Sequence, residues 1–269
     1  MIPAPVRYVR ASSLDDAFEA LAEPDAKALA GGQSLLPVLK LRIVRPSLLV
    51  DIGDLGLAEI EVAGDELRIG ALTTWDALAS ATELRRPALA ALGECAADVG
   101  DLQVRNRGTI GGSLAHADPA SDVLAVVLAL GARLELRSQS GARSLSVQEF
   151  LVGPFTTALG PQELITAVVA PIPEPGSGSA YVSVEHPASG FALAGAAALV
   201  RPDGTSSVAV TGVGATAFSL PDGEDPPAAL AEAEIYGDRF ASDEYRRHAA
   251  GVVVGRALEL ARRRAEEDR

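Results

Sequence analysis

Apolar and polar residues change period several times along the first 54 positions. Leu14, Phe18 and Leu21 fall on one face of a helix, and Ser12 or Ser13 precedes that helix as an N-cap. An alternating segment, typical of a strand, precedes it, and a short apolar run, also typical of a strand, follows it. The pattern therefore predicts strand, helix, strand, helix and strand in turn, over residues 6–11, 12–24, 26–30, 34–46 and 47–54.

The pattern becomes more irregular from about Leu57 onward, but it still alternates strands and helices. Thr74 is expected to begin one helix, and Pro87 lies near the start of the next. Asp118 and Pro119 are expected to open a third helix. The predicted strands cover residues 67–73, 133–138 and 163–171, and the predicted helices begin at 74, 85, 118 and 146.

A run of turn and breaker residues, "PIPEPGSGS" at 171–179, marks the clearest linker. After it, alternating segments predict a small antiparallel sheet, and residues 242–269 predict a terminal helix. The helix is expected to bury five side chains: Tyr245, Ala249, Val252, Val253 and Leu260. These features predict an α+β protein with an N-terminal α/β lobe, a second α/β lobe and a sheet-plus-helix domain, over residues 1–56, 57–172 and 173–269.

Net charge narrows the possible partners. The formal charge of −13 argues against nucleic acid, because phosphate-binding proteins present clustered Lys and Arg. The chain has no run of about eighteen apolar residues and no apolar region at its start that would indicate a secretory signal. We therefore expect a cytoplasmic protein without a membrane segment.

The residues that usually hold metals are scarce. Cys95 is the only cysteine, whereas iron–sulfur clusters usually need four thiolates. The three histidines, His116, His186 and His248, are scattered along the chain, which argues against a structural zinc site. We expect no metal site, so any redox chemistry would require an organic cofactor.

Two glycine pairs beside small hydroxyl residues are the candidate binding elements. They lie in "AGGQSLLP" (30–37) and "RGTIGGSLAHADPASD" (107–122). A glycine pair lets a ligand approach the backbone, and a following helix aims free N–H groups at an anion. Neither stretch is a Walker loop or a G-x-G-x-x-G fingerprint. The alternative is a pair of ordinary turns with serine caps, and Asp122 could bind ribose hydroxyls or only stabilise a helix N-terminus.

Three motifs together resemble the FAD-binding medium subunit of molybdenum hydroxylases, which include carbon monoxide dehydrogenases and xanthine-dehydrogenase-like enzymes. They are "AGGQSLLPVLKLR", "TIGGSLAHADPASD" and "EHPASGFALAGAAA", and the resemblance covers almost the whole chain. It implies a two-lobed, PCMH-type FAD-binding domain that clamps an extended FAD. A small C-terminal domain with a three-stranded antiparallel sheet and helices would follow.

The resemblance also implies a set of cofactor-binding residues. Residues 30–34 and 109–113 would together hold the pyrophosphate, through backbone N–H groups and through the hydroxyls of Ser34, Thr109 and Ser113. Other positions would lie near the ribityl chain, the adenine or the isoalloxazine ring, although the apolar ones could equally be core and His116 a solvent-facing loop residue. The full set is Ala30, Gly31, Gly32, Gln33, Ser34, Leu35, Thr109, Ile110, Gly111, Gly112, Ser113, His116, Asp122, Ile165, Ser183, Phe191 and Ala192.

One position departs from the family pattern. Many relatives place a lysine where "YVSVEHP" has Ser183. A cation there would stabilise the reduced, anionic flavin, so its absence should lower the reduction potential or change the preferred oxidant. Glu185 would act in the same direction if it faced the ring.

The resemblance implies an electron-transfer role without a catalytic acid or base on this chain. Electrons would come from a large molybdenum-cofactor subunit through a small iron–sulfur subunit, reach FAD, and leave to NAD, a quinone or oxygen. A dimer of heterotrimers would be the usual assembly. Two other interpretations remain open: a non-catalytic assembly subunit, and a stand-alone flavin oxidase. The substrate of the whole enzyme cannot be inferred from this chain.

Overall fold

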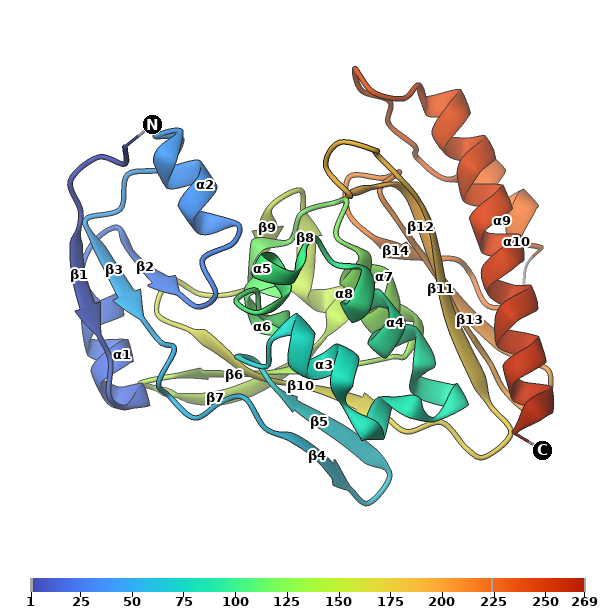
Figure 1. The fold of residues 1–269 in the computed structure, drawn as a ribbon, viewed down its shortest axis with the longest axis horizontal. Helices are drawn as coiled ribbons and strands as arrows, with labels where there is room; N and C mark the ends of the chain where they lie inside the picture. Colours follow the sequence, from blue (N-terminus) through green and yellow to red (C-terminus); the bar gives the residue numbers. More distant parts are fainter. Residues whose placement is uncertain (1, 224, 269) are drawn as a thin grey trace.

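Three consecutive blocks of the chain lie in a row in the computed structural model (Figure 1). The structure describes residues 2–223 and 225–268. Positions 1, 224 and 269, which belong to the predicted first domain, a predicted loop and the predicted terminal helix, lie outside the described residues. The N-terminal lobe is at one end, a larger second lobe is in the centre, and a sheet covered by a long helix is at the other end (Figure 1).

The N-terminal lobe is a parallel sheet in the strand order β1-β3-β2. Ala17 and Phe18 of α1 are buried in its core, and the Ser13 hydroxyl caps α1 by accepting from the N–H of Asp16 at 3.1 Å. The predicted order of elements is therefore confirmed. The elements are β1 (Arg7–Arg10), α1 (Leu14–Leu21), β2 (Ala26–Leu29), α2 (Leu35–Lys40) and β3 (Leu48–Asp51).

Helix α2 differs from the prediction at both ends. Ser34 precedes it, but Ser34 has helical dihedral angles and its hydroxyl makes no capping hydrogen bond. The helix ends at Lys40 and not near residue 46, because Arg42 has a φ of +58°, in the left-handed region that stops an α-helix.

The second lobe packs helices against an antiparallel sheet in the order β4-β5-β10-β6-β7. The predicted helix at 85–100 is split into a 3₁₀ turn, η2 (Pro87–Leu89), and the helix α4 (Ala90–Asp98). The helix predicted from Asp118 begins at Asp122, because the carbonyl of Asp118 accepts a turn hydrogen bond from the N–H of Ser121. The strands are β4 (Ile60–Ala63), β5 (Glu66–Gly70), β6 (Arg133–Ser138), β7 (Gly141–Ser146), β8 (Leu151–Gly153), β9 (Thr156–Thr157) and β10 (Leu164–Pro171). The helices are α3 (Trp75–Ser80), η1 (Thr82–Arg85), η2 (Pro87–Leu89), α4 (Ala90–Asp98), α5 (Leu102–Arg105), α6 (Ile110–His116), α7 (Asp122–Ala129) and α8 (Val147–Phe150).

The C-terminal sheet is covered on both faces. Along β12, Ala196 and Ala198 pack with the core beneath α10, whereas Ala197 and Leu199 pack with the core of the second lobe. This alternation explains why β12 is almost entirely apolar. The elements are β11 (Gly178–Glu185), β12 (Ala192–Val200), β13 (Ser206–Thr211), β14 (Phe218–Ser219), α9 (Pro226–Glu232) and α10 (Asp243–Glu267).

Two predictions for this domain were wrong in detail. The sheet has four strands and not three, because the two-residue β14 pairs with β13 and is too short to give an alternating pattern. Tyr245 is 47% exposed and not inward, since its neighbour Arg246 occupies the buried position. Ala249 and Val253 are buried as predicted.

Candidate functional site

The two glycine stretches are in direct contact, although about eighty residues separate them. A Cβ on Gly31 would overlap the carbonyl group of Arg107, at 2.6 Å from the carbonyl carbon and 2.8 Å from the Cα of Gly108. Such distances are far shorter than normal contacts, so only glycine fits at position 31. Because β2 ends just before Gly31, the carboxyl edge of the parallel sheet faces the second lobe at this point, a usual location for ligands in α/β folds.

The first stretch presents unused hydrogen-bond donors. Across residues 2–223 and 225–268, the N–H groups of Gly32, Gln33 and Ser34 donate to no protein acceptor, and the Ser34 hydroxyl is not used for capping. Gly32 has a φ of +76°, which favours glycine. The three residues are not fully buried. Successive free N–H groups beside the start of a helix fit an anion such as a pyrophosphate.

The second stretch differs from the first, although the sequence predicted that both would bind an anion through backbone N–H groups. Gly111 and Gly112 lie inside the first turn of α6, which Thr109 caps by accepting from the N–H of Gly112 at 3.2 Å. A Cβ on Gly111 would lie 2.7 Å from the carbonyl oxygen of Ala71, so this glycine allows close packing within the lobe.

The N–H groups of residues 110–113 all donate within the protein. The second stretch therefore offers a ligand mainly the hydroxyls of Thr109 and Ser113 and the Cα of Gly112, where an added Cβ would lie 2.8 Å from the Oγ1 of Thr109 and 3.8 Å from the Cβ of Ala30. The Ser113 hydroxyl already shares a 2.9 Å hydrogen bond with that of Ser121.

Asp122 connects the second lobe to the C-terminal sheet. The phenol of Tyr181, on β11, donates a hydrogen bond to its carboxylate. Burial raises the pKa of Asp122 to about 7; the Tyr181 hydrogen bond opposes this shift, and the negative charge of Glu185 adds to it. Burial also raises the pKa of the neighbouring Cys95 thiol. The site thus holds a carboxyl group that exchanges its proton near neutral pH.

The folded protein should lose stability as the pH rises through the range set by Asp122. The folded state keeps the proton up to a pKa of about 7, whereas the unfolded chain releases it near 3.8. The stabilising effect of the proton is therefore greatest below pH 4, falls between about 4 and 7, and is constant above that range. Asp122→Asn should flatten this fall in a series of thermal melts from pH 4 to 9. A fall that persists in Asp122→Asn would contradict the assignment.

The end of β13 lies against the segment that precedes α7. Thr211 donates its hydroxyl to the carbonyls of Pro119 and Ser121, at 2.8 and 3.0 Å. Ser183 pairs with Gly195 across the sheet, and its hydroxyl lies 3.4 Å from the carboxylate of Glu185.

The two apolar residues predicted beside the flavin differ in exposure. Phe191 is 49% exposed at the end of the β11–β12 turn, whereas Ala192 is buried at the start of β12. A Cβ on Gly212 would lie 2.6 Å from the carbonyl oxygen of Ala192, and the N–H of Gly212 donates to Pro119. Ala192 is therefore brought next to the Pro119–Asp122 segment, with the Phe191 ring left accessible.

The remaining predicted residues lie at the margins of this region. The His116 ring packs against Phe155 with centroids 5.2 Å apart, so it is not simply a solvent-facing loop histidine. Ile165 is buried in the core of the second lobe on β10. The carbonyl of its neighbour Thr166 accepts from the N–H of Ala71, which ties β10 to the end of β5.

The sequence analysis missed three residues that contribute to the candidate site. Arg107 contributes its backbone carbonyl, Tyr181 the partner of Asp122, and Thr211 the hydroxyl that joins the C-terminal sheet to the second lobe. Each acts across a long sequence separation, and no local pattern signals such contacts.

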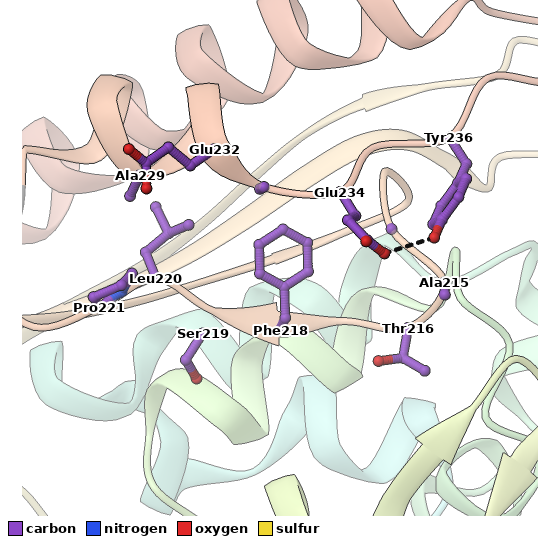
Figure 2. Close-up of a pocket in the computed structure, with 12 residues that line it drawn as sticks. Ala215, Thr216, Phe218, Ser219, Leu220, Pro221, Ala229, Glu232, Glu234 and Tyr236 are labelled. Carbon is purple, nitrogen blue, oxygen red and sulfur yellow. Dashed lines mark hydrogen bonds between the residues drawn. The ribbon is translucent and has the colours of Figure 1, made fainter.

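A separate hollow of about 440 Å³ lies in the C-terminal domain (Figure 2). Phe218 and Leu220 give it an apolar side, and Tyr236 donates to Glu234 at its rim over 2.8 Å. It contains none of the predicted cofactor residues. Within the described part of the chain, no cluster of three or more metal-ligating side chains occurs, and no helix is long and apolar enough to cross a membrane.

Comparison with known proteins identifies the class to which this fold and site belong. Residues 4–173 match the family described as the FAD binding domain in molybdopterin dehydrogenase. The chain is 36% identical to the carbon monoxide dehydrogenase medium chain of Afipia carboxidovorans, over 99% of this chain and 100% of that one. It is 38% identical to the 6-hydroxypseudooxynicotine dehydrogenase complex subunit alpha of Paenarthrobacter nicotinovorans, with 98% and 97% covered.

A solved structure extends the similarity to the whole fold. The carbon monoxide dehydrogenase of Hydrogenophaga pseudoflava superposes with a TM-score of 0.92 at 33% identity, covering 98% of this chain and 99% of that one. The chain belongs to the family of FAD-binding domains of molybdopterin dehydrogenases. The α+β FAD-binding fold, the FAD cofactor and the oxidoreductase class that the motifs predicted are confirmed.

Proposed function

We propose that this chain is the FAD-binding electron-transfer subunit of a molybdenum hydroxylase and that it holds FAD between its first two lobes. The observation that carries the proposal is the contact of Gly31 with Arg107 and Gly108, which joins the two glycine stretches at one place. The free N–H groups of Gly32, Gln33 and Ser34 would bind the pyrophosphate from one side. The Thr109 and Ser113 hydroxyls would approach it from the other.

The rest of the cofactor would extend toward the C-terminal sheet. Ser183 and Phe191 would lie beside the isoalloxazine ring, with Ala192 closing the base of that region. Asp122 would accept hydrogen bonds from the ribityl hydroxyls, or would hold a proton near the cofactor, since its carboxyl group titrates close to neutral pH. FAD supplies the chemistry of taking up and releasing electrons, and the residues of this chain position it and set its electrostatic surroundings.

The partners follow from the relatives. These are medium chains or subunits of multi-subunit dehydrogenases. We infer that this chain assembles with a large molybdenum-cofactor subunit and a small iron–sulfur subunit, as a dimer of heterotrimers. It would pass electrons from the iron–sulfur clusters to NAD, a quinone or oxygen.

Rapid mixing tests the electron-transfer role. The FAD-loaded chain is mixed anaerobically with its iron–sulfur partner, which has been reduced beforehand. Loss of the flavin absorbance at about 450 nm, coupled to reoxidation of the partner, is expected. A flavin that stays oxidised while the complex is intact would favour the assembly-subunit interpretation.

Ser183→Lys should raise the flavin reduction potential. A half-buried ammonium group beside the ring would stabilise the negative charge that reduction places on the cofactor. The measurement is a spectroscopic redox titration of both proteins, with Ser144→Lys on the remote strand β7 as the control for added charge. An unchanged potential in Ser183→Lys would show that position 183 does not face the ring.

A further inference from the structure

An aromatic pair joins the turn between β11 and β12 to the loop that precedes α10. The rings of His186 and Phe240 pack with centroids 4.5 Å apart and an interplanar angle of 60°. The guanidinium carbon of Arg239 lies 4.4 Å from the centroid of the Phe240 ring. Phe240 is 51% exposed, so its ring forms a contact between two loops and does not fill a hydrophobic core.

The loop that carries Phe240 is anchored to the buried side of α10. One carboxylate oxygen of Asp238 accepts from the N–H groups of Phe240 and Ala241, at 2.8 and 3.1 Å. The other oxygen accepts from the guanidinium of the buried Arg246 at 2.8 Å. Ala241 is also buried. The backbone that presents the Phe240 ring is therefore fixed by groups that do not take part in the ring contact.

His186 organises the turn on the other side of this contact. Its carbonyl accepts from the N–H groups of Ser189 and Gly190, at 3.1 and 2.9 Å, and its own N–H donates to the carbonyl of Phe191 at 2.8 Å. Its ring nitrogen Nδ1 accepts from the N–H of Ala188 at 3.3 Å. A backbone N–H can only donate, so Nδ1 carries the lone pair in this geometry. The ring of His186, and not only its backbone, is thus part of the turn.

The turn carries Phe191, and His186 is its inward-facing residue. Residues 187–191 are all exposed, whereas His186 is half-buried. The N–H of Phe191 donates to the hydroxyl of Ser189 at 3.4 Å, and that hydroxyl lies 3.2 Å from Nδ1 of His186. In Figure 1, α10 begins at the end of the C-terminal domain where this turn lies. The position of the Phe191 ring therefore depends on His186 and, through His186, on Phe240.

We propose that Phe240 is a positioning residue for the flavin: its ring, packed against His186, holds the β11–β12 turn and so keeps Phe191 beside the isoalloxazine ring. The inference rests on the proposed function, which places Phe191 at that ring. Phe240 acts through His186 and does not touch the cofactor. Its effect on the flavin is to keep the Phe191 ring in place, so that less water reaches the isoalloxazine.

Hydrogen–deuterium exchange of the chain tests the contact between the two loops. Phe240→Ala removes the ring and should speed exchange of the amides of residues 186–191 about twofold to tenfold, because the turn opens more often without this packing. Phe240→Tyr keeps an aromatic ring and should preserve the wild-type rate. Tyr236→Ala is the matched control, since Tyr236 is 53% exposed in the same loop but donates its hydroxyl to Glu234.

The flavin reduction potential tests the positioning role. Phe240→Ala should raise the potential in a spectroscopic redox titration, because a displaced Phe191 lets water reach the ring and water stabilises the negative charge of the reduced cofactor. Phe191→Ala should raise it at least as much. The double variant should match Phe191→Ala alone, since both substitutions act on the position of one ring. Tyr236→Ala should keep the wild-type potential.

Each measurement can overturn the inference. Wild-type exchange at residues 186–191 in Phe240→Ala would show that the aromatic contact does not hold the turn. An unchanged potential in Phe240→Ala, or additive shifts in the double variant, would show that Phe240 does not position Phe191 for the flavin. Failure of the proposed function has a separate signature: the wild-type chain would carry no FAD and the positioning role would fail with it, while the exchange rates would still respond to Phe240→Ala.

Discussion

Gly31→Ala is expected to disrupt FAD binding and to destabilise the protein. The single added methyl group would overlap the peptide between Arg107 and Gly108, where backbone and not a flexible side chain must move. Overpacking of this kind costs about 1–3 kcal/mol of unfolding free energy. The two stretches would also separate, so the FAD dissociation constant should rise by about tenfold to a hundredfold, equivalent to about 1.4–2.8 kcal/mol. Denaturant unfolding and FAD titration by fluorescence measure the two effects.

Gly251→Ala is the matched control for that experiment. Gly251 lies within α10, and an added Cβ would meet nothing within 4 Å. Alanine should stabilise the helix there by about 0.5–1 kcal/mol without affecting FAD. If Gly31→Ala bound FAD as tightly as the wild type, the lobe contact would not be part of the cofactor site.

Arg246→Leu is expected to lower the unfolding free energy by about 2–4 kcal/mol. Arg246 is 6% exposed, and its guanidinium donates to the carbonyl of Gly212, to that of Leu193 at 2.9 Å and to the carboxylate of Asp238 at 2.8 Å. Leucine would leave two backbone carbonyls without this donor. The substitution should also weaken FAD binding, because Gly212 packs against Ala192 in the region proposed for the flavin.

Arg256→Leu provides the comparison on the same helix. Arg256 is exposed on α10, so its replacement should change the unfolding free energy by less than about 0.5 kcal/mol. Urea unfolding of both variants measures the difference. Equal stabilities for Arg246→Leu and Arg256→Leu would show that the buried guanidinium does not support the C-terminal sheet.

The N-terminal lobe could be predicted from sequence because its strands and helices are separated by clear signals. Phe18 marks the buried face of α1, and Ser13 caps it. The edge strands β4 and β7 were missed because β4 has only four residues and because most residues of both strands are exposed, with Arg143 and Ser144 in the middle of β7. A strand that is short or exposed along most of its length gives too weak an alternation of apolar and polar residues for a sequence analysis to detect.

The glycine motifs pointed to two stretches that the fold brings into contact, but the sequence did not explain why glycine is needed there. Gly31 is required by a backbone carbonyl about eighty residues away, and Gly111 by Ala71 inside its own lobe. Both requirements come from steric contacts between residues that are far apart in the sequence. The Asp122–Tyr181 hydrogen bond spans 59 residues and joins the second lobe to the C-terminal sheet, and neither side chain is unusual in its local context. Only the folded chain brings these groups together.

The most direct test of the central claim is the identity and amount of the flavin bound to the chain. The wild-type protein is purified, its absorption spectrum recorded, and the released cofactor identified by mass. The account predicts bands near about 370 and 450 nm, and one FAD per chain. A colourless protein that also fails to bind added FAD, alone and with its partner subunits, would contradict it.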